Sequence, residues 1–220
     1  MNTETIIQKT IQFVKKTLLN TEAGHDWFHV ERVYQNAMLI AEKESVDTFV
    51  VTLGALLHDI ADAKFHNGDE SIGPKMASDF LTEIGVDSTV VIHIQNIIRY
   101  ISFKQSKDYL DTAFTSKELE VIRDADRLDA MGAIGIARAF NYGGFKNRSL
   151  YDPDIKPKLN MSKEEYKNSK APTINHFYEK LLLLKDMMHT ETGRKMAEDR
   201  HQFMLMYLDQ FYKEIQFDKN

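Results

Sequence analysis

Apolar residues recur at helical spacing along most of this 220-residue chain, and this periodicity limits its possible folds more than any other feature. The stretch 48–61 is apolar almost all round, so we expect it to be a central, buried helix. Glycine and proline contribute only 10 and 4 residues, which together is about half of average usage. So few turn-forming residues disfavour a many-stranded β-sandwich and a disordered chain. The expected fold class is all-α.

Short polar residues mark where several of these helices begin. Asp26 and Asp47 each precede an apolar-periodic stretch and are expected N-caps, and Asp87 or Ser88 is expected to start the helix that follows near 88. The expected helices cover about 6–19, 27–41, 48–61, 74–85, 88–101, 117–128, 130–140, 175–188 and 192–215. The periodicity fails over about 141–175, which holds Gly143, Gly144 and three of the four prolines. This segment is expected to be a long loop, and a loop of this length is usually functional or disordered.

Charge and composition exclude several classes of protein. The net charge of −5 gives no basic footprint for nucleic acid, although the segment 138–170 is locally basic. No apolar run approaches the roughly 20 residues that cross a bilayer, and no secretory signal pattern is present. With 0 cysteines, disulfides and thiolate metal sites are impossible. We therefore expect a cytoplasmic protein without a nucleic-acid or membrane partner.

One histidine–aspartate pair lies at the end of the most apolar helix. His58 follows Ala55-Leu56-Leu57, and Asp59 is adjacent. Burying a carboxylate beside an imidazole is costly unless a cation compensates, and a divalent metal would supply that charge. In a continuing helix, Asp62 would lie on the same side as this pair. The alternative is a core histidine bonded to a backbone carbonyl, with Asp59 at a helix end.

Two further stretches contain possible metal ligands. Residues 123–129, RDADRLD, alternate acids with arginines among apolar neighbours; an exposed, salt-bridged helix face is the alternative. Residues 25–29, HDWFH, have the histidine spacing of the H-E-x-x-H zinc helix, with Asp26 in place of glutamate. Because Asp26 also resembles a helix start, His25 would then precede the helix. A zinc peptidase is therefore the weaker interpretation.

The order His29, His58-Asp59, Asp126 resembles the HD-domain superfamily of metal-dependent phosphohydrolases. The blocks GHDWFH, LLHDI and DADRLDA, followed by GAIG, are similar to the small bacterial HD hydrolases of the YpgQ/YedJ type. This resemblance implies an all-α HD-domain fold and one divalent ion held by His29, His58, Asp59 and Asp126. It also implies hydrolysis of phosphate esters or anhydrides, with (deoxy)nucleoside triphosphates cleaved to monophosphate and pyrophosphate.

The number of histidines favours one metal ion over two. Two-metal HD phosphodiesterases carry further ligand histidines between the HD pair and the last aspartate, whereas only His66 and His93 fall in that interval here. Each of these is expected to be structural or solvated. The ligand set admits Mn²⁺, Mg²⁺, Co²⁺, Ni²⁺, Fe²⁺ or Zn²⁺.

Anionic phosphates require cations beyond the metal, because two aspartates already offset its charge. The expected substrate-binding residues are Lys64, Arg99, Lys104, Arg127, Arg138 and Arg148, each of which has a solvated surface charge as its alternative. Asp59 and Asp62 are the expected catalytic carboxylates, Asp62 to orient water or move its proton. An alternative for Asp62 is a structural helix-end acid.

A single domain over 1–220 is expected, with a metal-site core at about 24–144, the basic loop at about 141–175 and C-terminal helices at about 175–216. The loop could close over substrate as a lid. The partner is expected to be a small phosphorylated molecule, most naturally a nucleotide, and the protein a monomer or homodimer. Two alternatives remain open: a phosphomonoesterase on nucleotides or other metabolites, and a non-catalytic regulatory HD module that binds metal or nucleotide.

Overall fold

A computed structural model describes residues 1–19, 26–61, 69, 71–101, 114–162, 165 and 168–215. All regular elements in these ranges are helical, which confirms the all-α prediction. The chain divides into two compact units, Met1–Asp126 (unit 1) and Arg127–Asn220 (unit 2), and the boundary falls inside one helix. The single-domain prediction is left untested by this division. None of the described helices has the length and apolar character to cross a membrane.

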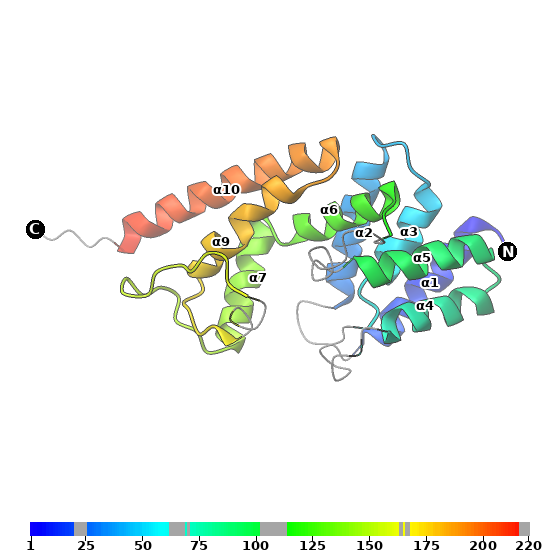
Figure 1. Ribbon diagram of the computed structural model, residues 1–220, viewed down its shortest axis with the longest axis horizontal. Helices are drawn as coiled ribbons and strands as arrows, with labels where there is room; N and C mark the ends of the chain where they lie inside the picture. Colours follow the sequence, from blue (N-terminus) through cyan, green and yellow to red (C-terminus); the bar gives the residue numbers. More distant parts are fainter. Residues whose placement is uncertain are drawn as a thin grey trace, which may run out of the picture. The chain divides into compact units, whose positions relative to one another are not determined.

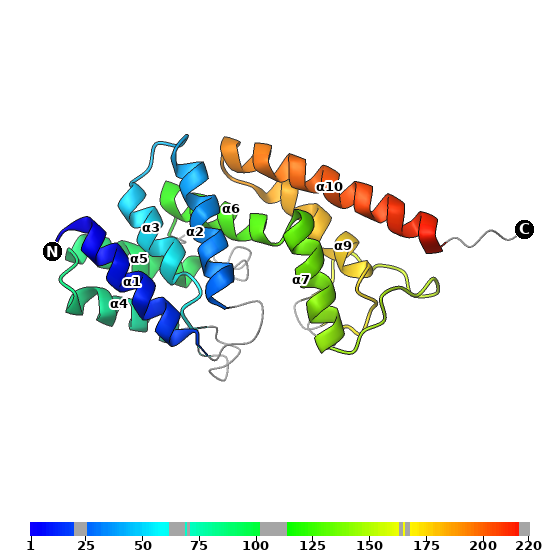
Figure 2. The same ribbon diagram turned by 180° about the vertical axis from the view of Figure 1, so that it is seen from behind.

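Unit 1 is built around its most apolar helix (Figure 1). Its elements are α1 (Thr3–Thr17), α2 (Trp27–Ala41), α3 (Thr48–Leu57), α4 (Ile72–Glu83), α5 (Ser88–Tyr100) and most of α6 (Lys117–Asp129). Helix α3 contacts α1, α2 and α5, and α4 lies alongside α5, as Figure 2 also shows. Every residue of α3 from Val50 to Leu57 is buried, as its uninterrupted apolar sequence predicts.

Local capping interactions set the starts of three helices. Asp26, Asp47 and Asp87 are the N-caps of α2, α3 and α5, and each side chain accepts a backbone N–H of the first turn. Helix α4 ends in a Schellman motif: the N–H of Gly85, at φ 75°, donates to Thr82 O, and that of Val86 to Leu81 O. These starts and the end near Gly85 confirm the sequence expectations.

The third helix is shorter than predicted. It ends at Leu57 instead of near Ala61, because the ring of His58 bonds the Ala55 carbonyl, 2.8 Å away. In a continuing helix that carbonyl would accept the amide of Asp59. The chain tightens instead, with Ile60 N–H donating to Leu57 O. His58 and Asp59 therefore lie in a turn after the helix, not on it.

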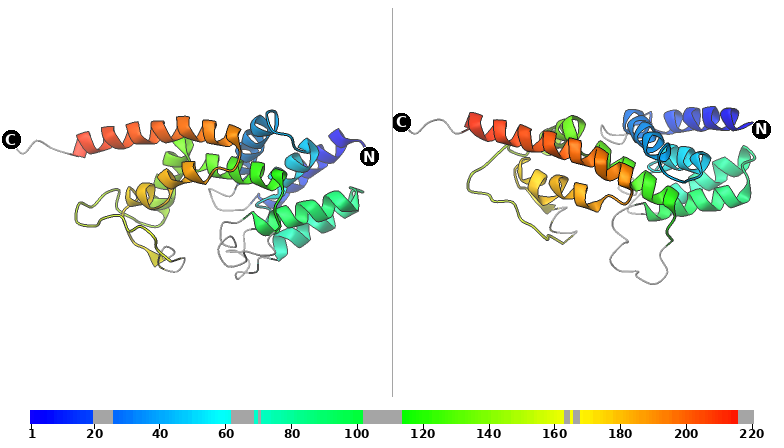
Figure 3. Two further views of the ribbon diagram at one scale, coloured as in Figure 1. Left: turned by 45° about the horizontal axis from the view of Figure 1, so that its top comes forward. Right: turned by 90° about the horizontal axis from the view of Figure 1, so that it is seen from above.

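Unit 2 consists of α7 (Gly132–Phe145), α9 (Asn175–Glu179), the 3₁₀ helix η3 (Leu181–Met187) and α10 (Glu191–Ile215), together with the end of α6. Figure 3 shows α10 as one long helix, and it packs on α7 and η3. The core is aromatic: Phe177 is buried, Tyr207 stacks on it and Phe140 packs against it at a tilt.

Two predicted boundaries in unit 2 are wrong. Helix α7 continues to Phe145 through Gly143 and Gly144, which were expected to open the loop. A side chain at Gly143 would collide with Thr173, so this glycine permits close packing rather than a turn. The predicted helix 175–188 is broken at Lys180, whose φ of −146° separates α9 from η3.

Candidate metal centre

His29 reaches the centre of unit 1 from the first turn of α2. Its backbone N–H donates to Asp26 Oδ1 at 3.0 Å, so the N-cap that starts the helix also fixes the residue that carries the imidazole. The side chain is only 2% exposed. A capping residue and a buried histidine three positions later therefore form one local device.

His58 enters from the C-cap of α3. Its Nδ1 lies 2.8 Å from Ala55 O, a carbonyl that can only accept, so Nδ1 carries the proton. The lone pair of the neutral ring is then on Nε2. Burial lowers the pKa of His58, and the charges of Asp126 and Asp59 only partly oppose that effect. The ring is therefore held neutral, which is the form that binds metals.

The carboxylates of Asp126 and Asp59 lie near the Nε2 atoms of these two rings. Asp126 Oδ1 lies 3.6 Å from His29 Nε2 and 4.0 Å from His58 Nε2. Asp59 Oδ2 lies 4.0 Å from His29 Nε2. The structure thus brings together all four residues that the resemblance implied as ligands.

This arrangement fits a divalent ion. Within the described residues, His58 Nε2 is buried without a hydrogen-bond partner, and it faces Asp126. A lone pair beside a carboxylate is unfavourable unless a cation lies between them. Ligand atoms of His29, His58 and Asp126 all lie within 4.8 Å of one another. An ion with bonds of about 2.1 Å needs ligand atoms about 3 to 4 Å apart, which is close to these separations.

Two hydrogen bonds join the part of helix α6 just before Asp126 to neighbouring helices. Asn36 on α2 donates to the carbonyl of Ala125 at 3.4 Å, one residue before Asp126. Arg123 donates to the backbone carbonyl of Tyr100 at the end of α5. We did not predict the role of Asn36. Its signal was a polar residue seven positions after His29, on the buried face of α2.

Another histidine of unit 1 has structural contacts. His93 Nε2 lies 3.0 Å from Ser116 Oγ, and the ring packs edge-on against Phe114. It therefore joins α5 to the start of α6. His66 and His25 lie outside the described residues. Of the two histidines in the zinc-peptidase alternative, the structure therefore describes only His29. Helix α2 begins at Trp27, after Asp26.

Three of the predicted site residues, Asp62, Lys64 and Lys104, lie outside the described part of the chain. Arg99 is exposed in the last turn of α5, in unit 1. The other predicted phosphate-binding arginines belong to unit 2.

Those arginines have internal partners. Arg127 donates to the carbonyl of Met187, and Arg148 to that of Ser169 at 2.9 Å. Arg138 pairs with buried Asp129. Substrate binding by these residues remains a prediction.

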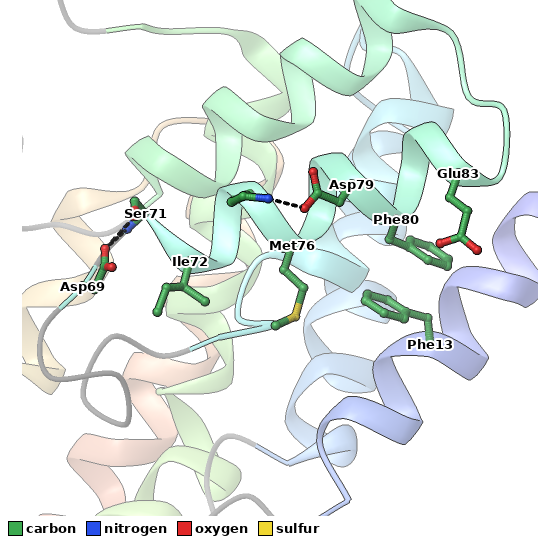
Figure 4. Close-up of a pocket in the computed structure, with 9 residues that line it drawn as sticks. Phe13, Asp69, Ser71, Ile72, Met76, Asp79, Phe80 and Glu83 are labelled. Carbon is green, nitrogen blue, oxygen red and sulfur yellow. Dashed lines mark hydrogen bonds and ion pairs between the residues drawn. The ribbon is translucent and has the colours of Figure 1, made fainter.

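A separate hollow in unit 1, of about 710 Å³, lies between α1 and α4 (Figure 4). Phe13 and Phe80 stack along it with ring centroids 4.0 Å apart, and the Lys75–Asp79 ion pair lies on its rim. None of its lining residues belongs to the histidine–aspartate cluster. The chemistry of the cluster therefore does not extend into this hollow.

Comparison with known proteins agrees with this geometry. Residues 27–131 match the HD domain. YpgQ of Bacillus subtilis (strain 168) is 38% identical over 203 residues, which are 92% of this chain and 90% of that protein. The chain belongs to the HD superfamily of hydrolases. The resemblance deduced from the motifs is thereby confirmed.

Two crystal structures extend the comparison of this HD hydrolase to its fold. An HD-superfamily hydrolase from Bacillus thuringiensis has a TM-score of 0.78 and 40% identity, covering 99% of this chain and 100% of that one. Bacillus subtilis YpgQ in complex with ADP has a TM-score of 0.76 and 34% identity, covering 97% of each chain. Both likenesses run through unit 1 and unit 2.

Proposed function

We propose that this HD hydrolase is a metal-dependent pyrophosphohydrolase that cleaves (deoxy)nucleoside triphosphates to monophosphate and pyrophosphate. The observation that carries the proposal is the convergence of His29, His58 and Asp126, with the unpartnered Nε2 of His58 among them. The structure of YpgQ with ADP supports a nucleotide as the substrate class. We propose one ion per site, held by these three residues and Asp59.

Each of these side chains has a distinct task in the proposed reaction. Ala55 O holds the His58 ring in the tautomer that leaves Nε2 for the ion, and Asp26 holds the turn that carries His29. When bound, the ion would polarise a phosphoryl oxygen and lower the pKa of a water. Asp59, which is 21% exposed, would accept a proton from that water in the proposed reaction. Asp62 is proposed to share this task.

The phosphates need positive charge from the chain as well. The two carboxylates of Asp59 and Asp126 balance a divalent ion, so a triphosphate brings uncompensated negative charge. We propose Arg99 and the basic residues Lys64, Lys104, Arg127, Arg138 and Arg148 as its partners. We also propose, from the sequence alone, a cytoplasmic location and a monomeric or homodimeric state.

The test is a product-release panel on metal-stripped protein. Mn²⁺, Mg²⁺, Co²⁺, Ni²⁺, Fe²⁺ and Zn²⁺ are added back singly, and pyrophosphate and orthophosphate are measured from ribo- and deoxyribonucleotides at each phosphate level. We expect pyrophosphate from triphosphates and none from an Asp126→Asn protein. Orthophosphate from monophosphates would replace the proposal by a phosphomonoesterase. Bound metal and nucleotide without any product would indicate a regulatory module.

A further inference from the structure

Two exposed aromatic rings and two cations gather at the C-terminal end of α7, in unit 2. Tyr142 and Phe145 are 51% and 64% exposed. The ammonium of Lys146 lies 5.0 Å from the centroid of the Phe145 ring and 5.6 Å from that of Tyr142. The guanidinium of Arg148 lies 5.7 Å from the Tyr142 centroid. We call these four residues the aromatic–cation patch.

Hydrogen bonds hold the backbone that carries this patch. Asn147, at φ 52°, ends α7 in a Schellman motif: its N–H donates to Gly144 O and that of Arg148 to Gly143 O. The next residues are tied to a distant segment, because Thr173 N–H donates to Ser149 O and Ile174 N–H to Leu150 O. Main-chain bonds therefore fix the backbone positions from which the rings and cations project, so binding does not have to order the backbone.

The electrostatic surroundings of the patch are positive. Lys146 makes no ion pair with any described residue. Arg148 and Lys180 carry charge close enough to His176 to lower its pKa further, beyond the lowering by burial. The two cations of the patch would therefore attract an anion.

Gly144 adds an independent sign that something approaches this surface. It is helical, its φ is not positive, and a side chain there would meet nothing within 4 Å. Packing and conformation therefore give no reason for glycine, which is less stable than alanine in a helix. Close approach of a ligand to the backbone is a reason that remains.

We propose that the aromatic–cation patch binds a nucleoside phosphate, its base against Tyr142 and Phe145 and its phosphates paired with Lys146 and Arg148. Aromatic faces stack on any base, and ammonium and guanidinium groups pair with phosphate oxygens. This inference rests on the proposed function, since a nucleotide is the proposed substrate of that reaction. It deepens the function by predicting tolerance among bases, because stacking reads no hydrogen-bond pattern.

Binding without metal tests the patch apart from catalysis. ATP affinity is measured by calorimetry in EDTA, where no turnover occurs, for the wild type, Phe145→Ala and Lys146→Glu. Matched controls are Phe203→Ala, an exposed ring on α10, and Lys156→Glu, an exposed lysine of the connecting segment. We expect the patch variants to bind ATP about tenfold or more weakly and the controls to match the wild type. Equal affinity in all five proteins, or a wild type that does not bind ATP, overturns the proposal.

Ligand fragments and one further variant sharpen the test. Phe145→Ala should weaken the binding of adenosine but not of tripolyphosphate. Lys146→Glu should weaken the binding of tripolyphosphate but not of adenosine. Gly144→Ala should raise the melting temperature while weakening ATP binding, a combination that damage to the fold does not produce. If the patch variants lose binding of single-stranded oligothymidylate but keep that of ATP, the patch is a nucleic-acid surface and the proposal is wrong.

The outcomes for the patch and for the proposed function are separable. Loss of ATP binding in the patch variants, with no pyrophosphate from the metal-loaded wild type, would keep the patch and refute the function. Unchanged ATP affinity of Phe145→Ala and Lys146→Glu in EDTA, with pyrophosphate released by the metal-loaded wild type, would keep the function and refute the patch.

Discussion

His58 occupies two opposing environments at once. One ring nitrogen bonds the carbonyl of Ala55, and the other faces Asp126 in a buried place. Since the bonded nitrogen must be the donor, the facing nitrogen offers a lone pair to a carboxylate, an arrangement that a cation converts from repulsive to attractive. A single side-chain bond within the turn thereby prepares one ligand of the centre.

Replacement of His58 by alanine should abolish metal binding. Bound divalent ion, measured by mass spectrometry of the gel-filtered protein, is expected to fall from one per chain to none, and product release by more than about a hundredfold. His93→Ala is the matched control, because that histidine of the same unit bonds Ser116. Full metal occupancy in His58→Ala would remove His58 from the ligand set.

Acid should destabilise the protein through His176. Burial, followed by the charges of Lys180 and Arg148, lowers the pKa of His176 to about 3 from 6.5. Between these values the unfolded chain binds a proton that the folded chain does not, so the free energy of unfolding falls as the pH drops below 6.5. The slope is up to about 1.4 kcal/mol per pH unit.

The measurement is urea unfolding of the metal-free protein at pH 7.5 and 5.0, for the wild type and His176→Asn. The variant cannot titrate at this position, so its loss of stability on acidification should be smaller by up to about 2 kcal/mol. An equal loss in both proteins would show that His176 charges freely in the folded state.

At the scale of elements, the centre is assembled from helix ends. His29 lies in the first turn of α2, His58 caps the end of α3, and Asp126 lies in the last turn of α6. The Asp26 cap sets the start of α2 and therefore controls where His29 lies. Asn36 adds a cross-connection, since it bonds the backbone of α6 from α2.

Loss of the N-cap of α2 should therefore weaken the metal centre. Asp26→Ala is expected to cost about 1 kcal/mol of stability and to lower Mn²⁺ affinity about tenfold, because the first turn carries His29. Asp87→Ala removes the equivalent cap of α5, which carries no residue of the cluster. Titration calorimetry should find the affinity lowered in the first variant only. Equal loss in both would make it a general effect of stability.

At the scale of the whole molecule, the four proposed ligands all belong to unit 1. Unit 2 has its own aromatic core and its own network of arginines on backbone carbonyls. A ligand stabilises the part of a protein that it binds in the folded state. The two units should therefore respond differently to the metal.

Hydrogen exchange of the full chain measures that difference. Addition of Mn²⁺ at about a hundred times its dissociation constant should slow amide exchange in α2 and α3. The free energy of protection should rise there by up to about 2.7 kcal/mol. Amides of α10 should keep their rates. Uniform slowing across α3 and α10 would contradict this prediction and show that the units open as one body.

Much of this protein follows from local interactions, and these are legible in the sequence. Asp26, Asp47 and Asp87 each cap a helix through contacts within three residues, so the starts of α2, α3 and α5 were predictable. The apolar character of α3 also foretold its burial. The motif order identified His29, His58 and Asp126 as related, but not the distances between them.

Contacts between distant residues decided the rest. Helix α7 continues through Gly143 because Thr173 packs against it, thirty positions along the chain. Arg138 pairs with Asp129 because the turn after α6 brings them together, and Arg127 bonds the carbonyl of Met187, sixty positions along the chain. The sequence by itself determined the helical class, the capped helix starts, the family and the kinds of ligand. Only the tertiary structure decided which side chains meet, because packing, unlike periodicity and capping, depends on residues far apart in the chain.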